Sequence, residues 1–460
     1  MSSENTVQEQ IKYLKSLKAI RERAKKVYEK AEANALNHFK VDFSKLEVVV
    51  SKVIFLIKRD YKQISDIPPH GRWRHFEVGG KDRVQTLIEE WKIGCDTLEI
   101  TRRLLDLFVV SVLLDAGAGN AWTYKEPETG NTYSRSEGLA LASLYMFKSG
   151  AFSSSSSQPY QVDAHKLLNI SVEDVRLAFQ VDENNPLEGL EGRANLLSRL
   201  GHALESHPEF FKSNDNSPLR PGNLLDYLLL NSTINETDTT VKIDTLWTIV
   251  IYGFSEVWPP TRTSLNGVSL GDVWPCEVLR LPSSSPDSTD HLVAFHKLSQ
   301  WLTYSLVEPM KRISGITFEG IEQMTGLPEY RNGGLFVDTG VLTLKEPDFE
   351  RGISYYKQNK LSSTVQSDVE IVPMFEVNDP LIIEWRAVTV VLLDVVADKI
   401  RDALGLSKVQ FSLAQMLEAG TWKACHDILA KQDAGREIAA TLRPITRGPP
   451  IAVKSDGTVF

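Results

Sequence analysis

The segment LIIEWRAVTVVLLDVV, Leu381–Val396, carries three charged residues among sixteen and is otherwise almost entirely apolar. A helix that is apolar nearly all the way round is buried in the core of its protein. The many β-branched residues of this segment also leave a buried strand open. We expect a buried helix over Leu381–Leu404, at the heart of a mainly α fold.

The charges inside this apolar segment need partners, because an unpaired buried charge is costly. At about 100° per helical residue, Glu384 and Arg386 point roughly 200° apart, so they cannot pair with each other. Their partners must therefore come from other segments. Two interpretations remain: a structural network of buried ion pairs, or one wall of a polar pocket. A strand would instead place both charges on one face.

Other helical patterns extend outward from this segment, and short strands interrupt them. The first third of the chain is helical in pattern, with an apolar stripe at three- and four-residue steps over Leu14, Leu17, Ile20, Ala24, Val27 and Ala31. Further helices are predicted over Arg83–Leu114, Val293–Glu308 and Leu413–Ala430, and short strands over Leu335–Leu344 and Val365–Val372. We expect one single domain over 1–460, a large helical globule with minor β structure. Its N-terminal helical part covers about 1–150, and its site-bearing part covers about 250–410.

Composition excludes several classes of function. The 460 residues are 42% hydrophobic and 24% charged, which is ordinary for a globular protein. A formal net charge of -9 argues against a nucleic-acid-binding surface. The start lacks the apolar core of a secretory signal, and no apolar stretch reaches the roughly 20 residues of a membrane span. Three widely spaced cysteines build neither a disulfide framework nor a zinc site. We expect a cytoplasmic protein with no nucleic-acid or membrane partner.

The stretch LPEYRNGGLFVDTG, Leu327–Gly340, is the most promising candidate site. An irregular segment can aim several polar groups into one cavity, and a Gly-Gly pair lets backbone approach a ligand closely. A capped turn has a similar composition and remains an alternative. The polar residues concerned are Glu329, Tyr330, Arg331, Asn332 and Asp338.

A second candidate is the helical stretch around His296–Glu308. Lys297, Trp301, Tyr304 and Glu308 follow one another at steps of four, three and four residues and form a polar-aromatic stripe. Packing explains such stripes as readily as substrate binding does. His296 has no second ligand three or four residues away, so we expect no metal, and no cofactor motif is present.

Loops rich in glycine and tryptophan supply weaker candidates. Asp115 ends a helical pattern in LLDAGAGN, which lacks the third glycine of a dinucleotide-binding loop, and Trp122 follows as an aromatic wall. Arg262 in WPPTRT, with Asp272 and Trp274 in GDVW, could hold a sugar or a phosphate; the alternative is packing of surface loops.

Together these motifs resemble one family. LLDAGAGNAWTY, RSEGLALASLYMF, GDVW, FHKLSQWLTYSLVEP, TGLPEYRNGGLFVD and EWRAVTVVLLD are similar to the family named for uracil catabolism in fungi and bacteria, over nearly the whole chain. The resemblance implies a step in a uracil-degrading route that proceeds through a uridine nucleotide. A relative of GTP cyclohydrolase II opens the pyrimidine ring in that route, and the N-glycosidic bond of a ribosylurea-type intermediate must then be broken to release urea.

A fainter similarity points to the glycosylases of queuosine salvage. Those enzymes carry an acid-Tyr-Arg motif and a later Glu-x-Arg-Ala motif in a DNA-glycosylase-like helical fold. The matching positions are Glu329–Arg331 and Glu384–Ala387. The first acid is Asp in those enzymes and Glu in this chain, one methylene longer.

The resemblance implies roles for the candidate residues. Cleavage of an N-glycoside develops positive charge on the sugar, which a nearby carboxylate stabilises. Glu329 is the expected stabilising or nucleophile-activating carboxylate, with Asp338 or Glu384 as helper. The substrate is a small nucleoside- or nucleotide-derived molecule, with or without a phosphate. The expected binding residues are Asp115, Trp122, Arg262, Asp272, Trp274, His296, Lys297, Tyr304, Tyr330, Arg331, Asn332 and Arg386.

Two alternatives stay open at the level of sequence. One is hydrolysis of another amide-bearing intermediate of the same route. The other is a non-catalytic scaffold or regulatory protein of that route, which would bind a nucleotide or a pathway enzyme without turning a substrate over.

Overall fold

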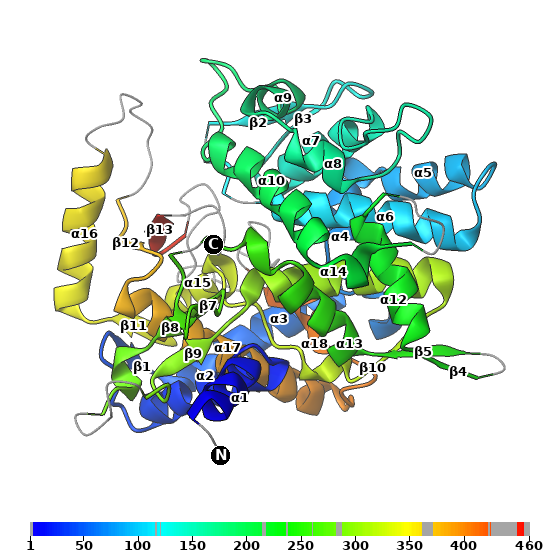
Figure 1. Ribbon diagram of the computed structural model, residues 1–460. Helices are drawn as coiled ribbons and strands as arrows, with labels where there is room; N and C mark the ends of the chain where they lie inside the picture. The colour runs from blue at the N-terminus through cyan, green and yellow to red at the C-terminus, as the bar shows by residue number, and fades with distance from the viewer. Residues whose placement is uncertain are drawn as a thin grey trace.

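The computed structural model describes residues 3–115, 117–119, 121–213, 218–235, 238–259, 261–281, 288–360, 371–421, 424 and 449–454. Within these ranges the chain is mainly helical, and its strands are two to four residues long (Figure 1). The predicted mainly α fold with minor β structure is confirmed. The helices are α1 (Ser3–Leu14), α2 (Leu17–Glu32), α3 (Leu46–Asp60), α4 (Trp73–Phe76), α5 (Arg83–Trp91), α6 (Thr97–Leu113), α7 (Arg135–Lys148), α8 (Ala164–Leu168), α9 (Val172–Ala178), α10 (Leu190–Ser206), α11 (Pro208–Phe211), α12 (Leu224–Leu230), α13 (Ile243–Thr248), α14 (Lys297–Ser314), α15 (Tyr330–Asp338), α16 (Glu346–Lys360), α17 (Pro380–Leu404) and α18 (Leu413–Met416).

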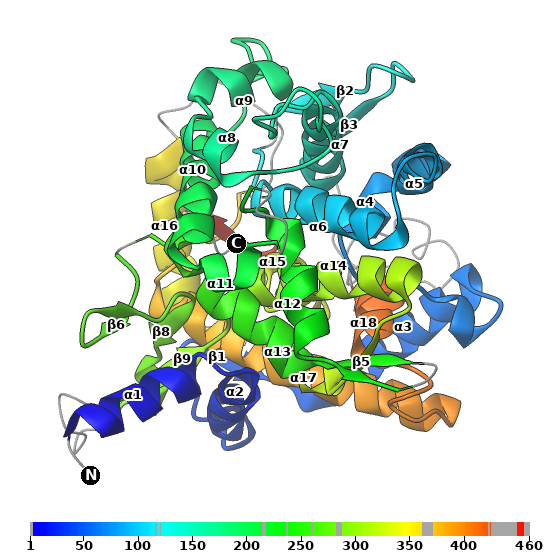
Figure 2. The same ribbon diagram turned by 45° about the vertical axis from the view of Figure 1, so that its right-hand side comes forward.

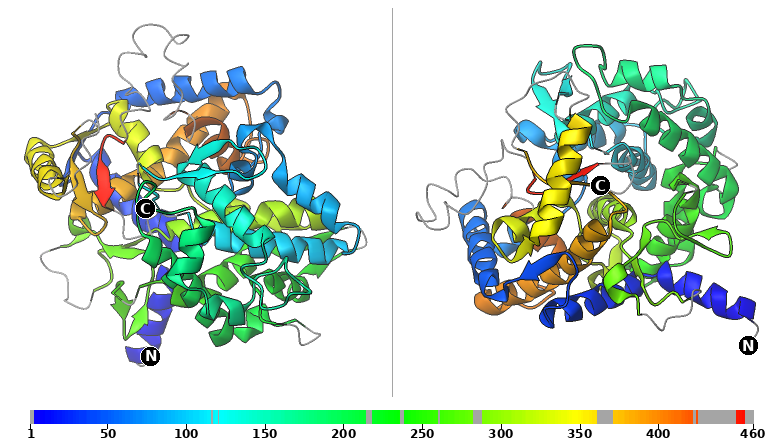
Figure 3. Two further views of the ribbon diagram at one scale, coloured as in Figure 1. Left: turned by 90° about the horizontal axis from the view of Figure 1, so that it is seen from above. Right: turned by 90° about the vertical axis from the view of Figure 1, so that its left-hand side faces the viewer.

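The strands form small separate sheets. Antiparallel pairs join β1 (Phe39–Val41) to β11 (Leu342–Leu344), β2 (Thr123–Lys125) to β3 (Thr132–Ser134), β6 (Ser264–Leu265) to β7 (Val268–Ser269), and β8 (Val273–Pro275) to β9 (Leu292–Ala294). β5 (Thr239–Lys242) lies between β4 (Thr233–Ile234) and β10 (Thr317–Glu319). β13 (Ala452–Lys454), red in Figure 3, pairs in parallel with β12 (Met374–Glu376) beside α16.

The segment Leu381–Leu404 is helical, as its apolar composition predicted, and it forms most of α17. Pro380 occupies the first turn, where its missing N–H costs nothing, and the Asp379 side chain accepts the N–H of Leu381 at 3.0 Å. Gly405, at φ 68°, ends the helix in the left-handed conformation that glycine adopts without strain. This long helix packs along α2 at the base of the molecule (Figures 1 and 2).

The predicted apolar stripe near the N-terminus is buried in the structure. Leu17, Ile20, Ala24 and Val27 are all buried along α2, which contacts α17 and β9. Ser16 caps the helix by accepting the N–H of Ala19 at 3.2 Å. A periodicity of 3.6 residues therefore located both the helix and the face that it buries.

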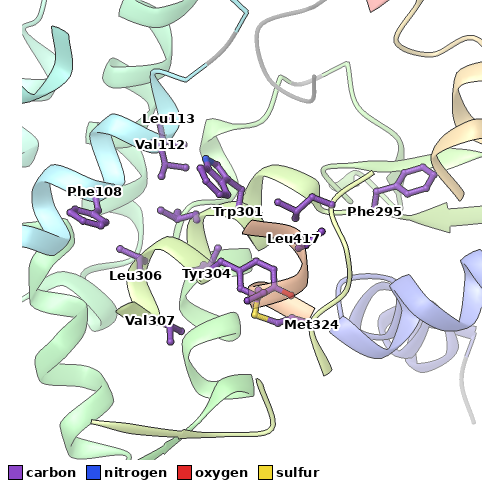
Figure 4. Close-up of a cluster of buried hydrophobic side chains, with 14 of the residues drawn as sticks. Phe108, Val112, Leu113, Phe295, Trp301, Tyr304, Leu306, Val307, Met324 and Leu417 are labelled. Carbon is purple, nitrogen blue, oxygen red and sulfur yellow. The ribbon is translucent and has the colours of Figure 1, made fainter. Parts of the chain in front are cut away.

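A second helix pair, α6 and α14, packs side by side in the middle of the protein. Figure 4 shows Phe108, Val112 and Leu113 of α6 beside Trp301 and Leu306 of α14. These side chains belong to one contiguous cluster of buried hydrophobic residues that extends through the described part of the chain. No helix of that part is long and apolar enough to cross a membrane.

Two predicted helices have different boundaries in the structure. The single helix expected over Arg83–Leu114 is two helices, α5 and α6, because Asp96 starts a new helix by accepting the N–H of Glu99 at 2.7 Å. The helix expected over Val293–Glu308 is α14, which begins at Lys297 and ends at Ser314. Its start is later because β9 takes the preceding residues and His296 has a left-handed φ of 46°.

The strand expected over Leu335–Leu344 is mostly wrong. Residues 330–338 form α15, and only Leu342–Leu344 is extended, as β11. The expected strand over Val365–Val372 lies, up to residue 370, outside the described residues. The helix expected over Leu413–Ala430 begins as α18 and continues as a π-helical turn, η9 (Leu417–Thr421); apart from residue 424, the remainder falls outside the described ranges.

Candidate active site

A buried ion pair between Asp272 and Arg386 joins three elements of the candidate site. Arg386 of α17 donates two parallel hydrogen bonds to Asp272, from Nη1 to Oδ1 at 2.8 Å and from Nη2 to Oδ2 at 2.7 Å. Trp274 Nε1 also donates to Oδ1, at 2.6 Å, and the backbone N–H of Lys297 donates to Oδ2, at 2.9 Å. Although burial raises the pKa of Asp272, Arg386 and these donors hold it well below its usual range. The partner of Arg386 thus comes from another segment, as the helix geometry predicted.

Glu329 lies next to this ion pair and caps α15. Arg386 Nε donates to the Pro328 carbonyl at 3.4 Å, which connects the pair to the residue before Glu329. The two Glu329 oxygens accept the backbone N–H groups of Arg331 and Asn332, each at 2.7 Å. Burial raises the pKa of Glu329, while Arg331 and Lys297 oppose the shift. The helix N-terminus therefore fixes this carboxylate in place.

The Gly-Gly pair in α15 serves helix packing. A Cβ at Gly333 would lie 2.7 Å from the Trp385 ring, and Trp385 Nε1 donates to the Gly333 carbonyl at 3.2 Å. A Cβ at Gly334 would lie 3.0 Å from Pro450. The sequence suggested that these glycines let the backbone approach a ligand. In the structure they let α15 pack closely against α17 and against the chain near Pro450.

The charge of Lys297 is influenced by two carboxylates. No described residue forms a hydrogen bond or an ion pair with its ammonium group. Burial lowers the pKa of Lys297, and the charges of Glu329 and Asp115, in that order, oppose the shift. An amine that carries no partner of its own and is flanked by two acids is available to a ligand.

Asp115, the second acid that acts on Lys297, lies two residues beyond the end of α6. Its Oδ2 lies 2.9 Å from Nη1 of Arg72, a fully buried guanidinium whose Nε donates to Ser111 Oγ at 2.8 Å. Asp115 Oδ1 and Arg72 Nη2 are buried and have no hydrogen-bond partner among the described residues. Buried polar atoms are nearly always satisfied, so these two atoms, which lie on one ion pair, are able to bond to another molecule.

Arg331 and His75 extend the polar cluster. Arg331 Nε donates to Tyr330 Oη at 3.1 Å, and although burial lowers the pKa of Arg331, Tyr330 and Glu329 raise it overall. Burial first, and then the charges of Arg72, His70 and Arg331, hold the pKa of His75 well below its usual value. His75 is therefore neutral at physiological pH.

The sequence analysis missed the contribution of the segment that carries Arg72 and His75. This segment, IPPHGRWRHFEVGG at residues 67–80, has the prolines and glycines of a connection and was not among the predicted sites. The missed signal was the density of Arg and His next to tryptophan. In the structure the rings of His70 and His75 lie 4.8 and 5.7 Å from that of Trp301.

The two expected catalytic helpers lie away from Glu329. Glu384 accepts the backbone N–H groups of Asn37 and His38, both at 2.8 Å, so it anchors the turn that follows α2. Asp338 is at the other end of α15, nine residues from Glu329. At a rise of 1.5 Å per residue, that separation is about 13 Å along the helix axis. Neither helper shares the surroundings of Lys297.

Three expected binding residues pack within the protein. Trp122 Nε1 donates to the Phe179 carbonyl at 2.9 Å. Tyr304, directed toward Met324 in Figure 4, donates from Oη to the Thr325 carbonyl at 3.1 Å. His296 Nε2 lies 2.8 Å from the Leu14 carbonyl. These contacts assign the three side chains to packing between elements.

The other expected residues gather around the cluster. Arg262 lies over the Trp274 ring, with its guanidinium carbon 4.9 Å from the ring centroid. Asn332 Nδ2 donates to the Leu327 carbonyl at 3.0 Å, while its Oδ1 is buried without a partner among the described residues. The candidate site accordingly comprises Arg72, Asp115, Asp272, Trp274, Lys297, Glu329, Tyr330, Arg331, Asn332 and Arg386, with Arg262 and His75 at its edge.

Residues of α6 and α14 also line a small, partly open depression. Its lining residues are Leu113, Val250, Phe254, Val257, Trp258, Leu298, Ser299 and Leu302. Leu113 is two residues from Asp115, and Leu298 directly follows Lys297, but neither Asp115 nor Lys297 lines this depression. Within the described ranges, no three His, Cys, Asp or Glu side chains are grouped so that they could hold a metal ion.

Comparison with known proteins gives concordant matches over almost the whole chain. Residues 13–460 match the family model described as a protein of unknown function, DUF1688. The chain is 42% identical over 461 residues to "Uracil catabolism protein 4" of Lachancea kluyveri, with 99% of this chain and 100% of that protein covered. It is also 42% identical over 455 residues to "Protein urg3" of Schizosaccharomyces pombe, with 98% and 99% covered.

Proposed function

This chain belongs to the DUF1688 family, and we propose that it acts in uracil catabolism as an N-glycosyl hydrolase that releases urea from a ribosylurea-type compound. The relative whose name states uracil catabolism supports the pathway. One observation supports the reaction: the buried carboxylate of Glu329 and the half-buried carboxylate of Asp115 both act on the charge of Lys297, whose ammonium group has no hydrogen-bond partner among the described residues.

Glu329 is suited to stabilise the transition state of this reaction. When the bond between the anomeric carbon and nitrogen breaks, positive charge develops on the ribosyl ring, and a fixed carboxylate beneath it lowers the barrier. The two backbone N–H groups use one lone pair on each Glu329 oxygen and leave the others for the sugar. Because the group is held before substrate binds, it need not reorganise during the reaction.

Neighbouring polar groups supply recognition. Asn332 Oδ1 can accept a hydrogen bond from a sugar hydroxyl or a urea N–H, since it has no partner among the described residues. Arg331 offers positive charge to the phosphate of a phosphorylated substrate. Both the free and the phosphorylated compounds are therefore appropriate substrates for a test.

The direct test incubates the purified protein with ribosylurea and, separately, with its 5′-phosphate. We expect urea and the free sugar, or sugar phosphate, to appear in equal amounts from at least one compound. Absence of urea from both compounds overturns the proposed reaction and leaves two alternatives: hydrolysis of another amide-bearing intermediate, and a non-catalytic role in the pathway.

Glu384 provides a matched control for Glu329. Both are buried carboxylates, both accept two backbone N–H groups, and burial raises the pKa of both. Glu329→Gln and Glu384→Gln therefore disturb similar hydrogen bonds. We expect turnover to fall about 100-fold or more in Glu329→Gln only, the size seen when one stabilising group is removed from an active site. Equal activity in both variants would show that Glu329 is a structural cap.

A further inference from the structure

Asp115 occupies a position that helix stability does not favour. The helix α6 ends at Leu113, and Asp115 is the second residue beyond it. The carbonyl groups at a helix C-terminus carry partial negative charge, so this end attracts cations and repels carboxylates. Something other than the helix must hold the acid there.

Two buried arginines hold Asp115 and its loop. Arg72 Nη1 lies 2.9 Å from Asp115 Oδ2 and also donates to the Ser136 carbonyl at 3.3 Å. Arg193 donates to the carbonyls of Leu114 and Gly117, each at 3.2 Å, and so fixes the backbone on both sides of Asp115. The carboxylate is therefore presented in one orientation.

The Asp115 oxygen that Arg72 does not contact, Oδ1, is the atom that can act on a ligand. Asp115 Oδ1 is buried and accepts no hydrogen bond from a described residue. The ammonium group of Lys297 is close enough for its charge to be affected by Asp115 and by Glu329. A buried carboxylate oxygen without a hydrogen bond, near an amine that also has no hydrogen-bond partner among the described residues, can accept a hydrogen bond from a small polar molecule.

We propose that Asp115 is the general base that activates water in the hydrolysis, and that Arg72 is the residue that positions it. This inference rests on the proposed function. As water attacks the anomeric carbon, a C–O bond forms and a water proton passes to Asp115 Oδ1. The C–N bond breaks, its electron pair goes to the urea nitrogen, and Lys297 gives that nitrogen a proton. Asp115 then returns its proton to Lys297, so that only water and substrate are consumed.

The first experiment compares Asp115→Asn with Asp106→Asn. Asp106 is a matched control on α6, since it is also buried and paired with an arginine, Arg220, at 2.8 Å. Urea release is measured from ribosylurea and its 5′-phosphate. We expect kcat of Asp115→Asn to fall about 100-fold or more, as for other general bases, with KM within about threefold of the wild type. Asp106→Asn should keep its kcat.

The second experiment tests the positioning role and does not depend on the folding of Asp115→Asn. Arg72 Nη1 holds Asp115 Oδ2 at 2.9 Å, so its removal in Arg72→Gln should lower kcat at least tenfold with KM within about threefold of the wild type. Arg72→Lys keeps a cation beside Asp115 and should restore kcat toward that of the wild type. A purely structural arginine would lower the melting temperature and leave the kcat of the folded protein unchanged.

The outcomes separate this inference from the proposed function. If the wild-type protein releases urea and Asp115→Asn does so at a rate within threefold, the role of Asp115 is overturned and the reaction stands. If folded Arg72→Gln keeps the wild-type kcat, the positioning role is overturned. If the wild-type protein releases no urea from either compound, the reaction itself falls, and the role of Asp115 falls with it.

Discussion

The ion pair between Asp272 and Arg386 makes a quantitative prediction about stability. Asp272→Asn removes the charge that compensates a guanidinium buried to 1% exposure. Breaking a buried ion pair by removing one partner costs about 3–5 kcal/mol, because the other charge stays buried and unpaired. The asparagine oxygen can still accept from Trp274 or Arg386, which favours the lower end of that range.

This cost converts into a change of melting temperature. An unfolding entropy of about 2.1 cal/mol/K per residue gives about 1 kcal/mol/K for 460 residues. We therefore expect differential scanning calorimetry to show Tm about 3–5 °C lower for Asp272→Asn. Glu89→Gln, which breaks the exposed ion pair with Lys92, should change Tm by less than about 1 °C.

A double variant and a pH series make the reasoning refutable. Arg386→Met in the Asp272→Asn background removes the stranded charge, so the double variant should be more stable than Asp272→Asn alone. Because the pKa of Asp272 is lowered in the folded protein, its contribution is present above pH about 4 and is lost on further acidification. A Tm for Asp272→Asn within 1 °C of wild type at pH 7 would refute this account of the pair.

Other predictions test neighbouring features. Burial raises the pKa of Glu308 to about 7. The wild-type protein should therefore lose stability relative to Glu308→Gln as pH rises from about 4.5 to about 7, and the difference in their free energies of unfolding should be constant above that range. Urea denaturation of both proteins at a series of pH values measures this difference. Gly333→Ala should lower the free energy of unfolding by about 1–3 kcal/mol, because the added Cβ would collide with Trp385. Gly192→Ala in α10 should raise the free energy of unfolding by about 0.4–1 kcal/mol, because the added Cβ meets nothing within 4 Å. Loss of a nearby carboxylate lowers the pKa of an amine, so Lys297 should be acylated faster in Asp115→Asn than in wild type at the same pH. Peptide mass spectrometry measures the rate of acylation, and an unchanged rate would show that Asp115 does not act on the Lys297 amine.

Elements with a strong apolar period were predictable from the sequence, and their boundaries depended on single residues. The apolar stripe of α2 and the long apolar sequence of α17 identified both helices. A helix buried on one face has apolar residues at helical spacing, and a helix buried on all faces is apolar along its whole length. Asp96 broke one expected helix and His296 delayed another. Caps and left-handed residues act on one or two backbone groups, so they leave little trace in a window of many residues.

The composition of the site was predictable only in part. Glu329 and Arg331 are neighbours in the chain, and Arg386 stood out as a charge in an apolar helix. Its partner, Asp272, is 114 residues away, and the segment that carries Arg72 resembled a plain connection. Which distant acid meets which arginine is decided by tertiary packing, so a single sequence holds no signal for it.

Hydrogen-bond satisfaction separates the framework of the site from the groups that can act on a ligand. Asp106 and Asp272 are both buried against an arginine, and both oxygens of each accept hydrogen bonds from the protein. Such carboxylates are fully occupied, and their pairs could be exchanged for apolar residues at little cost in stability. Asp115 has the same kind of partner but keeps one buried oxygen without a hydrogen bond, and its charge acts on the amine of the half-buried Lys297. A fold gains nothing from leaving this oxygen unsatisfied, so its position is better explained by a substrate that satisfies it than by stability.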